Sequence, residues 1–80
     1  MSVRILFLGP LRDLAAGPER EVAGPLDWAG LLEAVGEPIA DRLRDDRVHV
    51  ACAGRVLADK TALSAKDGDE VALLPPVSGG

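Results

Sequence analysis

The 80-residue sequence has little of the chemistry that builds metal centres, disulfides or catalytic pairs. Its one cysteine, Cys52, excludes an internal disulfide and a cysteine-based zinc site. We expect this thiol to be buried and structural, and we expect the only histidine, His49, to face solvent from a strand. His49 has no serine or cysteine at a spacing typical of a nucleophile and its base. Neither common glycine-rich phosphate-binding motif occurs, so the chain is not predicted to bind ATP by itself.

Aromatic residues and basic stretches are also scarce. Phe7 and Trp28 are the only aromatic residues, so the core is predicted to consist of leucine, valine, isoleucine and alanine. The net charge is −4 and no basic block occurs, so nucleic acid is not an expected partner, whereas a basic protein is. The first apolar run is short and contains Arg4, which is typical neither of a signal peptide nor of a membrane span. The cytoplasm is therefore the expected location.

The sequence does contain a series of short apolar segments separated by glycine and proline. The alternation over residues 3–7 predicts a strand that points Val3, Ile5 and Phe7 into the core. Leu6 and Leu8 are then left on the opposite face. Further strands are predicted at residues 19–23, 48–53, 55–57 and 71–74.

The strongest helix signal begins at Asp27, whose side chain is suited to accept a hydrogen bond from a free amide of the first turn. The apolar residues that follow recur at helical spacing and form one stripe that we expect in the core, namely Trp28, Leu31, Leu32 and Val35. Gly36 is suited to end this helix. A helical turn over residues 11–16 and a second helical piece from Pro38 are also predicted.

The order of these segments defines the expected fold class. Asp67-Gly68 is expected to form a hairpin turn before the last strand, and Pro75-Pro76 ends that strand. Two strands, one main helix and then two or three strands are typical of an α+β protein, with a single layer of sheet crossed by the helix. We expect one domain over residues 1–80, in which residues 76–80 form a flexible C-terminal tail.

The last eight residues, LLPPVSGG, end in two glycines. The rigid diproline directs the chain away from the sheet, and four residues beyond Pro76 extend about 13–14 Å. Gly79 and Gly80 have no Cβ atoms, so another protein's backbone can close around them. A free carboxylate is ionised at neutral pH and resists nucleophiles, so a partner would have to activate it, and adenylation is the obvious route.

Residues 67–80, DGDEVALLPPVSGG, resemble the C-terminal signature of the small subunit of molybdopterin synthase. That family belongs to the ThiS/MoaD superfamily of ubiquitin-like sulfur carriers. The resemblance extends over nearly the whole chain, because residues 3–16, the single main helix and the length also match. It implies the β-grasp fold, a mixed sheet of four to five strands with one main helix packed on one face.

The resemblance also implies a function for the tail. An E1-like adenylyltransferase would use ATP and magnesium to convert the Gly80 carboxylate to an acyl-adenylate, and sulfur transfer would then give a thiocarboxylate. With Gly79 beside it, Gly80 would donate that sulfur to a cyclic pyranopterin monophosphate precursor and so form the dithiolene of molybdopterin. The chain would be a non-catalytic, sulfur-donating subunit that binds neither a cofactor nor a metal itself.

The implied partner is the large catalytic subunit of the synthase, in a heterotetramer of two small and two large subunits. The family docks through hydrophobic positions and the approach to the tail, which correspond here to Leu8, Leu57, Leu74, Pro75, Pro76 and Val77. Strand alternation places Ala72 and Leu74 on the same outward face as Leu6 and Leu8. The alternatives are a sulfur carrier for thiazole (thiamine) or cysteine biosynthesis, a ubiquitin-like modifier joined to lysines, and an interaction domain with an inert tail.

Overall fold

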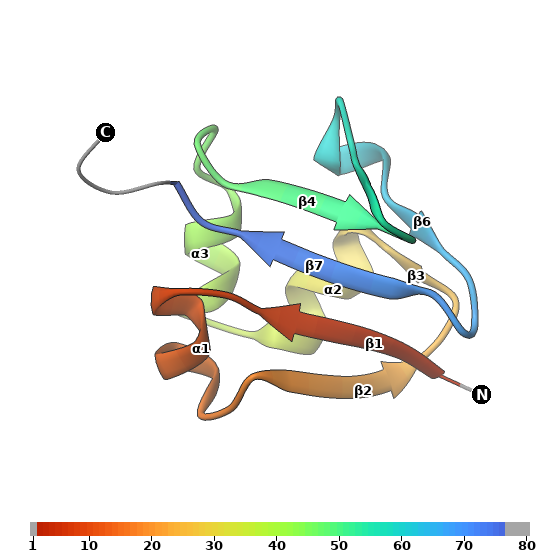
Figure 1. Cartoon of the computed structure of the whole chain (residues 1–80), viewed down its shortest axis with the longest axis horizontal. Helices are drawn as coiled ribbons and strands as arrows, with labels where there is room; N and C mark the ends of the chain where they lie inside the picture. The colour runs from red at the N-terminus through yellow and green to blue at the C-terminus, as the bar shows by residue number, and fades with distance from the viewer. Residues whose placement is uncertain (1, 77–80) are drawn as a thin grey trace.

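Five strands form a mixed sheet in the order β2-β1-β7-β4-β5 in the computed structural model, which describes residues 2–76 (Figure 1). The strands are β1 (Ser2–Phe7), β2 (Glu19–Ala23), β4 (His49–Cys52), β5 (Arg55–Val56) and β7 (Glu70–Leu74). β1 pairs in parallel with β7, and the other neighbours are antiparallel. The predicted α+β class and the mixed sheet are therefore confirmed.

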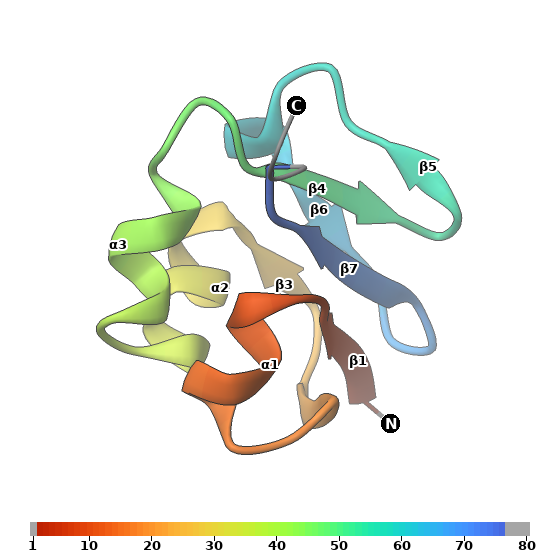
Figure 2. The same ribbon diagram turned by 60° about the vertical axis from the view of Figure 1, so that its left-hand side comes forward.

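The helices lie together on one side of this sheet (Figure 2). They are α1 (Pro10–Ala15), α2 (Trp28–Val35) and α3 (Ile39–Leu43). The N-cap prediction for α2 is confirmed, because Asp27 Oδ1 accepts a hydrogen bond from the Gly30 amide at 2.7 Å. Gly36 follows α2 with φ +66°, a left-handed conformation that glycine adopts at no steric cost. None of the helices within residues 2–76 has the length and apolar character needed to cross a bilayer.

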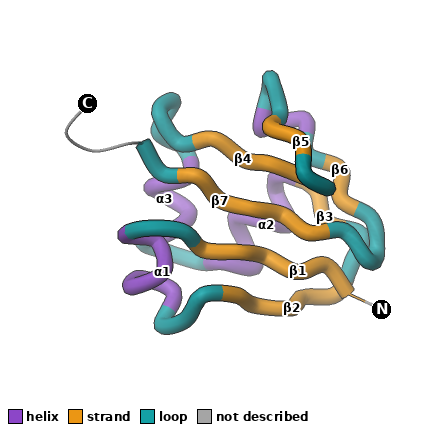
Figure 3. The backbone as a smooth tube through the Cα atoms, in the orientation of Figure 1, coloured by secondary structure: helices purple, strands orange, loops and turns teal. Residues whose placement is uncertain are grey.

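Three short elements between the main ones were not predicted. β3 (Leu26–Asp27) and β6 (Ser64–Ala65) pair antiparallel in a second, two-stranded sheet, and the 3₁₀ helix η1 (Lys60–Ala62) precedes β6 (Figure 3). Two residues are too few to show a periodicity, so the sequence pattern could not reveal these strands. The turn at Asp67-Gly68 joins β6 to β7, which lie in different sheets. The turn is confirmed, but the expected hairpin is wrong.

The core lies between the helices and the inner face of the five-stranded sheet. Val3, Ile5 and Phe7 are fully or almost fully buried, as the alternation in β1 predicts. The other large side chains that are fully buried are Leu31, Leu43, Val50, Val71 and Leu73. Trp28, by contrast, is only partly buried at the edge of the core, where its ring lies 5.9 Å from the ammonium group of Lys60.

Arg20 joins the edge strand β2 to the helices. It stands opposite Ile5 in the register of β1 and β2, on the helix side of the sheet. Its guanidinium group lies 5.6 Å from the centroid of the Phe7 ring, and Nη1 donates a hydrogen bond to the carbonyl oxygen of Ala34 at 3.0 Å. A carbonyl of the last turn of α2 is thereby satisfied. An inward-pointing charge on an edge strand also disfavours pairing with another sheet.

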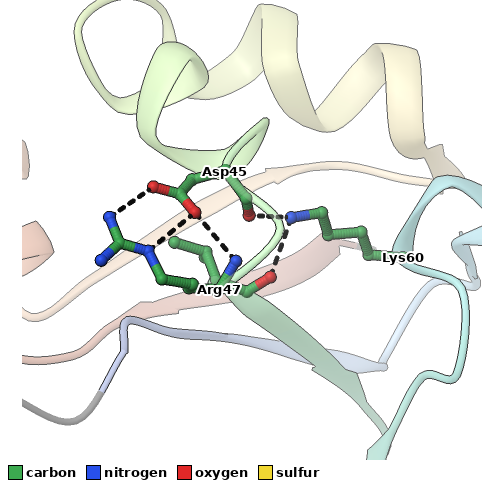
Figure 4. A network of polar contacts seen from close by, with 4 residues as sticks. Asp45, Arg47 and Lys60 are labelled. Atoms are coloured by element: carbon green, nitrogen blue, oxygen red, sulfur yellow. Dashed lines mark hydrogen bonds and ion pairs between the residues drawn. The ribbon is translucent and has the colours of Figure 1, made fainter.

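A polar network holds the loop between α3 and β4 (Figure 4). Asp45 accepts hydrogen bonds from Nη2 of Arg47 at 3.0 Å and from the Arg47 amide at 2.9 Å. The hydrogen bonds from the side chain and backbone of Arg47 lower the pKa of Asp45 from 3.8 to about 2. Nζ of Lys60 donates to the carbonyl oxygens of Asp45 and Val48. These contacts fix the residues that lead into β4.

The cap on α2 supplies a test of this fold. Asp27→Ala removes the acceptor of the Gly30 amide, and we expect a loss of about 1 kcal/mol in the free energy of unfolding. For a domain of this size that loss lowers the melting temperature by about 4–8 °C. Thermal unfolding followed by circular dichroism measures it. Asp46→Ala is the matched control, because this exposed carboxylate has no hydrogen bond or ion pair within residues 2–76. Equal melting temperatures for the two variants would contradict the role of the cap.

Candidate functional site: the outward sheet face and the base of the tail

The C-terminal segment leaves the domain from β7, which lies between β1 and β4 (Figure 1). Leu73 is fully buried and anchors the end of this strand in the core. Leu74 and Pro75 are half-buried, and Pro76 is exposed. Three residues of the predicted site, Val77, Gly79 and Gly80, lie outside the described residues. The structure therefore describes the base of the tail, Leu74 to Pro76, from which the tail departs.

The base of the tail is packed against the turn that follows β1. Gly9 has φ +56°, and a Cβ atom there would lie 3.1 Å from Cγ of Pro75. Both the left-handed backbone and this close approach favour glycine at the position. Beside this contact is a groove of about 290 Å³, lined by Pro10, Leu11, Leu14, Arg42, Pro75 and Pro76. Pro75 is thus held by the domain.

Side chains on the outward face of the sheet form an apolar row. The register pairs Leu6 with Ala72, Ala72 with Ala51, and Ala51 with Val56. These four residues, the outward strip, cross β1, β7, β4 and β5 on the face away from the helices. Val56 is 58% exposed. Exposed apolar surface of this kind is typical of a protein interface.

Two residues expected to bind a partner extend the outward strip toward the tail. Leu74 is half-buried and stands opposite His49 in the register of β7 and β4. Leu8 follows β1 directly and is 41% exposed. His49 is exposed on this face, as predicted. The tail therefore departs beside an apolar surface on the central strands.

The third leucine expected to dock, Leu57, lies differently. It is partly buried against the core, and its amide donates a hydrogen bond to the carbonyl oxygen of Val50 at 2.9 Å. Its neighbour Val56 is the residue of this segment that belongs to the outward strip. Val56 and Ala51 were not predicted to belong to this face. Their placement depends on the register of β5 on β4, which a two-residue strand does not reveal.

Charged side chains of β1, β2 and β7 lie beside the outward strip. Arg4 forms ion pairs with Glu19 at 3.2 Å and with Glu70 at 3.7 Å. All three side chains are about half-exposed, so these pairs contribute at most about 1 kcal/mol each to stability. They border the outward strip with polar surface. An apolar centre with a polar rim is the usual composition of an interface.

The one cysteine is poorly placed to act as a nucleophile. Cys52 is half-buried with its sulfur 3.9 Å from Oδ2 of Asp69. Burial and the neighbouring Asp69 carboxylate raise the pKa of the Cys52 thiol, so the thiolate is disfavoured at neutral pH. Within residues 2–76, no three His, Cys, Asp or Glu side chains are grouped to hold a metal ion. The site consists of an exposed apolar face and the base of the tail.

The sheet order and the helices on one face define a β-grasp, ubiquitin-like fold. The sequence matches the ThiS family over residues 5–80, and the chain belongs to that family. No curated protein matches the sequence at a significant level. The fold and the family are those of sulfur carriers and of ubiquitin-like modifiers.

Solved structures of several proteins are similar to this chain over its whole length. The HVO 2177 protein of Haloferax volcanii is 26% identical, with a TM-score of 0.77 over 100% of this chain and 87% of that one. SAMP1 of Haloferax volcanii, a small archaeal modifier protein, is 27% identical, with a TM-score of 0.74 over 100% of both chains. A chain from the complex of subunits 1 and 2 of the molybdopterin-converting factor of Helicobacter pylori 26695 is 25% identical, with a TM-score of 0.65 over 100% of both.

Two neighbouring leucines test which part of β7 is available for docking. Leu74→Glu places a carboxylate at the half-exposed outward face, and we expect the free energy of unfolding to change little. Leu73→Glu buries the same carboxylate in the core, and we expect a loss of more than about 3 kcal/mol in the free energy of unfolding. Urea unfolding measures both. Comparable losses for the two variants would show that Leu74 belongs to the core.

Proposed function

We propose that this chain is a sulfur carrier whose terminal carboxylate, at Gly80, is the group that carries the sulfur. The observation that best supports this function is the diglycine segment in the sequence after β7. The segment follows Leu73, which is buried in the core, and Pro75, which packs against the turn at Gly9. Membership of the ThiS family supports the same function. The domain supplies position and recognition, and the chemistry takes place at the end of the tail.

The proposed cycle begins with activation. An E1-like adenylyltransferase that holds ATP and magnesium joins the Gly80 carboxylate to the α-phosphate of ATP and releases pyrophosphate. The product, an acyl-adenylate, is a mixed anhydride with AMP as a good leaving group. A sulfur nucleophile then replaces AMP and leaves a thiocarboxylate at Gly80. Sulfur is more polarisable than oxygen, so the thiocarboxylate is the better nucleophile for the second stage.

The proposed recipient is the precursor of molybdopterin. In this proposal the chain is the small subunit of molybdopterin synthase, and its thiocarboxylate delivers sulfur to a cyclic pyranopterin monophosphate to build the dithiolene. The sequence DGDEVALLPPVSGG and the similarity to a chain of the molybdopterin-converting factor complex support this assignment. The large catalytic subunit would hold the precursor and receive Gly79 and Gly80, in a heterotetramer of two small and two large subunits.

The outward strip, Leu8 and Leu74 supply the proposed docking face for that subunit. They lie beside the point where the tail departs, so a partner that receives the tail is placed to cover them. Pro75, Pro76 and Val77 lead from this face to the glycines. The net charge of −4 favours a partner with a basic surface around its own apolar contact.

A second candidate function is protein modification. The similarity to SAMP1, a small archaeal modifier protein, favours it. Activation of Gly80 would be the same, but a lysine amine of a target would replace AMP and form an isopeptide bond. The two functions therefore differ only in the nucleophile that follows activation.

Mass spectrometry after incubation with the adenylyltransferase, ATP, magnesium and a sulfur donor tests the carrier. We expect exchange of one oxygen for sulfur at Gly80. A chain without Gly80 should show no exchange while its melting temperature stays nearly unchanged, because Leu73 is the last core residue within residues 2–76. Lysine-linked adducts in place of the exchange would favour the modifier, and an unchanged mass would contradict both functions.

The docking face has its own test. Leu74→Glu should weaken binding to the large catalytic subunit by at least about tenfold, since a desolvated and unpaired carboxylate costs more than about 1.4 kcal/mol. Ala29→Glu is the matched control, because it adds the same charge at an exposed position of α2, on the helix side of the domain. Isothermal titration calorimetry measures both affinities. Equal affinity for wild type and Leu74→Glu would remove Leu74 from the interface.

A further inference from the structure

The cations of this chain are mostly arginines. Seven of the nine basic residues are arginine, and the two lysines are Lys60 and Lys66. A guanidinium group stays protonated at any physiological pH and has no lone pair to offer an acyl group. Lys60 and Lys66 therefore carry the only side-chain amines of this protein that an activated carboxyl group can acylate.

The amine of Lys60 is part of the polar network at the loop between α3 and β4 (Figure 4). Its Nζ donates hydrogen bonds to the carbonyl oxygens of Asp45 and Val48, the second at 2.8 Å, and it lies 5.9 Å from the Trp28 ring. To attack an acyl group, this amine must lose a proton and turn its lone pair toward the carbonyl carbon. Acylation would remove the charge beside Trp28 and one or both of the hydrogen bonds to the α3–β4 loop. Lys60 is a poor acceptor for these reasons.

Lys66 differs from Lys60 in its exposure and in the contacts of its side chain. It is exposed, and its side chain has no hydrogen bond or ion pair within residues 2–76. Its backbone, however, is fixed, because the Lys66 amide donates to Oδ2 of Asp69 and its carbonyl accepts from the Asp69 amide, both at 2.9 Å. A free amine thus projects from an ordered turn.

The fold separates Lys66 from the tail of its own chain. The turn that holds Lys66 lies at one end of β7, and the tail departs from the other end (Figure 1). From Asp69 to Pro76 the chain advances about 23 Å, at about 3.3 Å per residue. The four residues after Pro76 span at most about 14 Å even when fully extended. Gly80 of the same chain therefore falls short of this turn, and the donor has to be another molecule.

We propose that Lys66 is the one lysine of this chain that accepts an activated carboxyl group, and that its donor is the C-terminus of a second copy. The proposal rests on the proposed activation of Gly80. The neutral Nζ of Lys66 attacks the Gly80 carbonyl carbon of the acyl-adenylate. A C–N bond forms, the C–O bond to the phosphate breaks, AMP leaves with the electron pair, and the amine proton passes to water. The product is an isopeptide-linked pair of chains, and no group is oxidised or reduced.

A chemical probe tests the choice of lysine without any enzyme. The probe is the N-hydroxysuccinimide ester of the peptide acetyl-Val-Ser-Gly-Gly, which carries the last four residues of the chain in activated form. We expect Lys66 of the full chain to be acylated at least about tenfold faster than Lys60, which corresponds to the hydrogen bonds that Lys60 would lose. In concentrated urea the two rates should converge. Equal rates in the native chain would overturn the proposal.

The enzymatic reaction tests the donor. With adenylyltransferase, ATP and magnesium but no sulfur donor, wild type and Lys60→Arg should give a linked dimer, and Lys66→Arg should give none. Dimers linked through Lys60 would overturn the assignment of Lys66 as the acceptor. So would the absence of any dimer while pyrophosphate is released and the acyl-adenylate accumulates. Absence of pyrophosphate release would instead contradict the proposed function. The acylation rates with the peptide ester would then still test whether Lys66 is the acceptor.

Discussion

The parallel pairing of β1 with β7 is the constraint on which the rest of this structure depends. It places the first and last strands side by side at the centre of the sheet, with Ile5 opposite Val71 and Phe7 opposite Leu73. Parallel neighbours cannot be joined by a tight turn, so the intervening chain has to cross over, and α2 and α3 lie in that crossover. The same pairing makes β7 a central strand. The tail therefore departs from a strand that is paired on both of its edges.

The two faces of the sheet have different roles in this arrangement: the inner face packs in the core, and the outer face is available to a partner. The side chains of β1 and β7 that point toward the helices are fully buried, whereas their neighbours Leu6, Ala72 and Leu74 face outward. A partner can cover the outward face without disturbing the core. The proposed carrier thus needs no catalytic group of its own, since its domain orients a carboxylate that other proteins activate and use.

Much of this fold was predictable from the sequence, because its main elements carry their own signals. β1 shows alternation, Asp27 and Gly36 bound α2, and the diproline ends β7. The sequence did not reveal β3, β6 or the partners of β5, since two-residue strands have no period of their own and are formed by tertiary pairing. For the same reason the pattern did not place Val56 on the outward face, whereas strand alternation and the family resemblance both indicate Leu8 and Leu74.

The contact between Gly9 and Pro75 connects parts of the chain that are distant in sequence. Gly9 ends the turn after the first strand, yet the ring it admits belongs to the start of the tail. A Cβ atom at position 9 would therefore press against the Pro75 ring, and either the ring or the turn would have to shift. A residue just after the first strand thus helps to set the place of Pro75, from which the C-terminal segment continues.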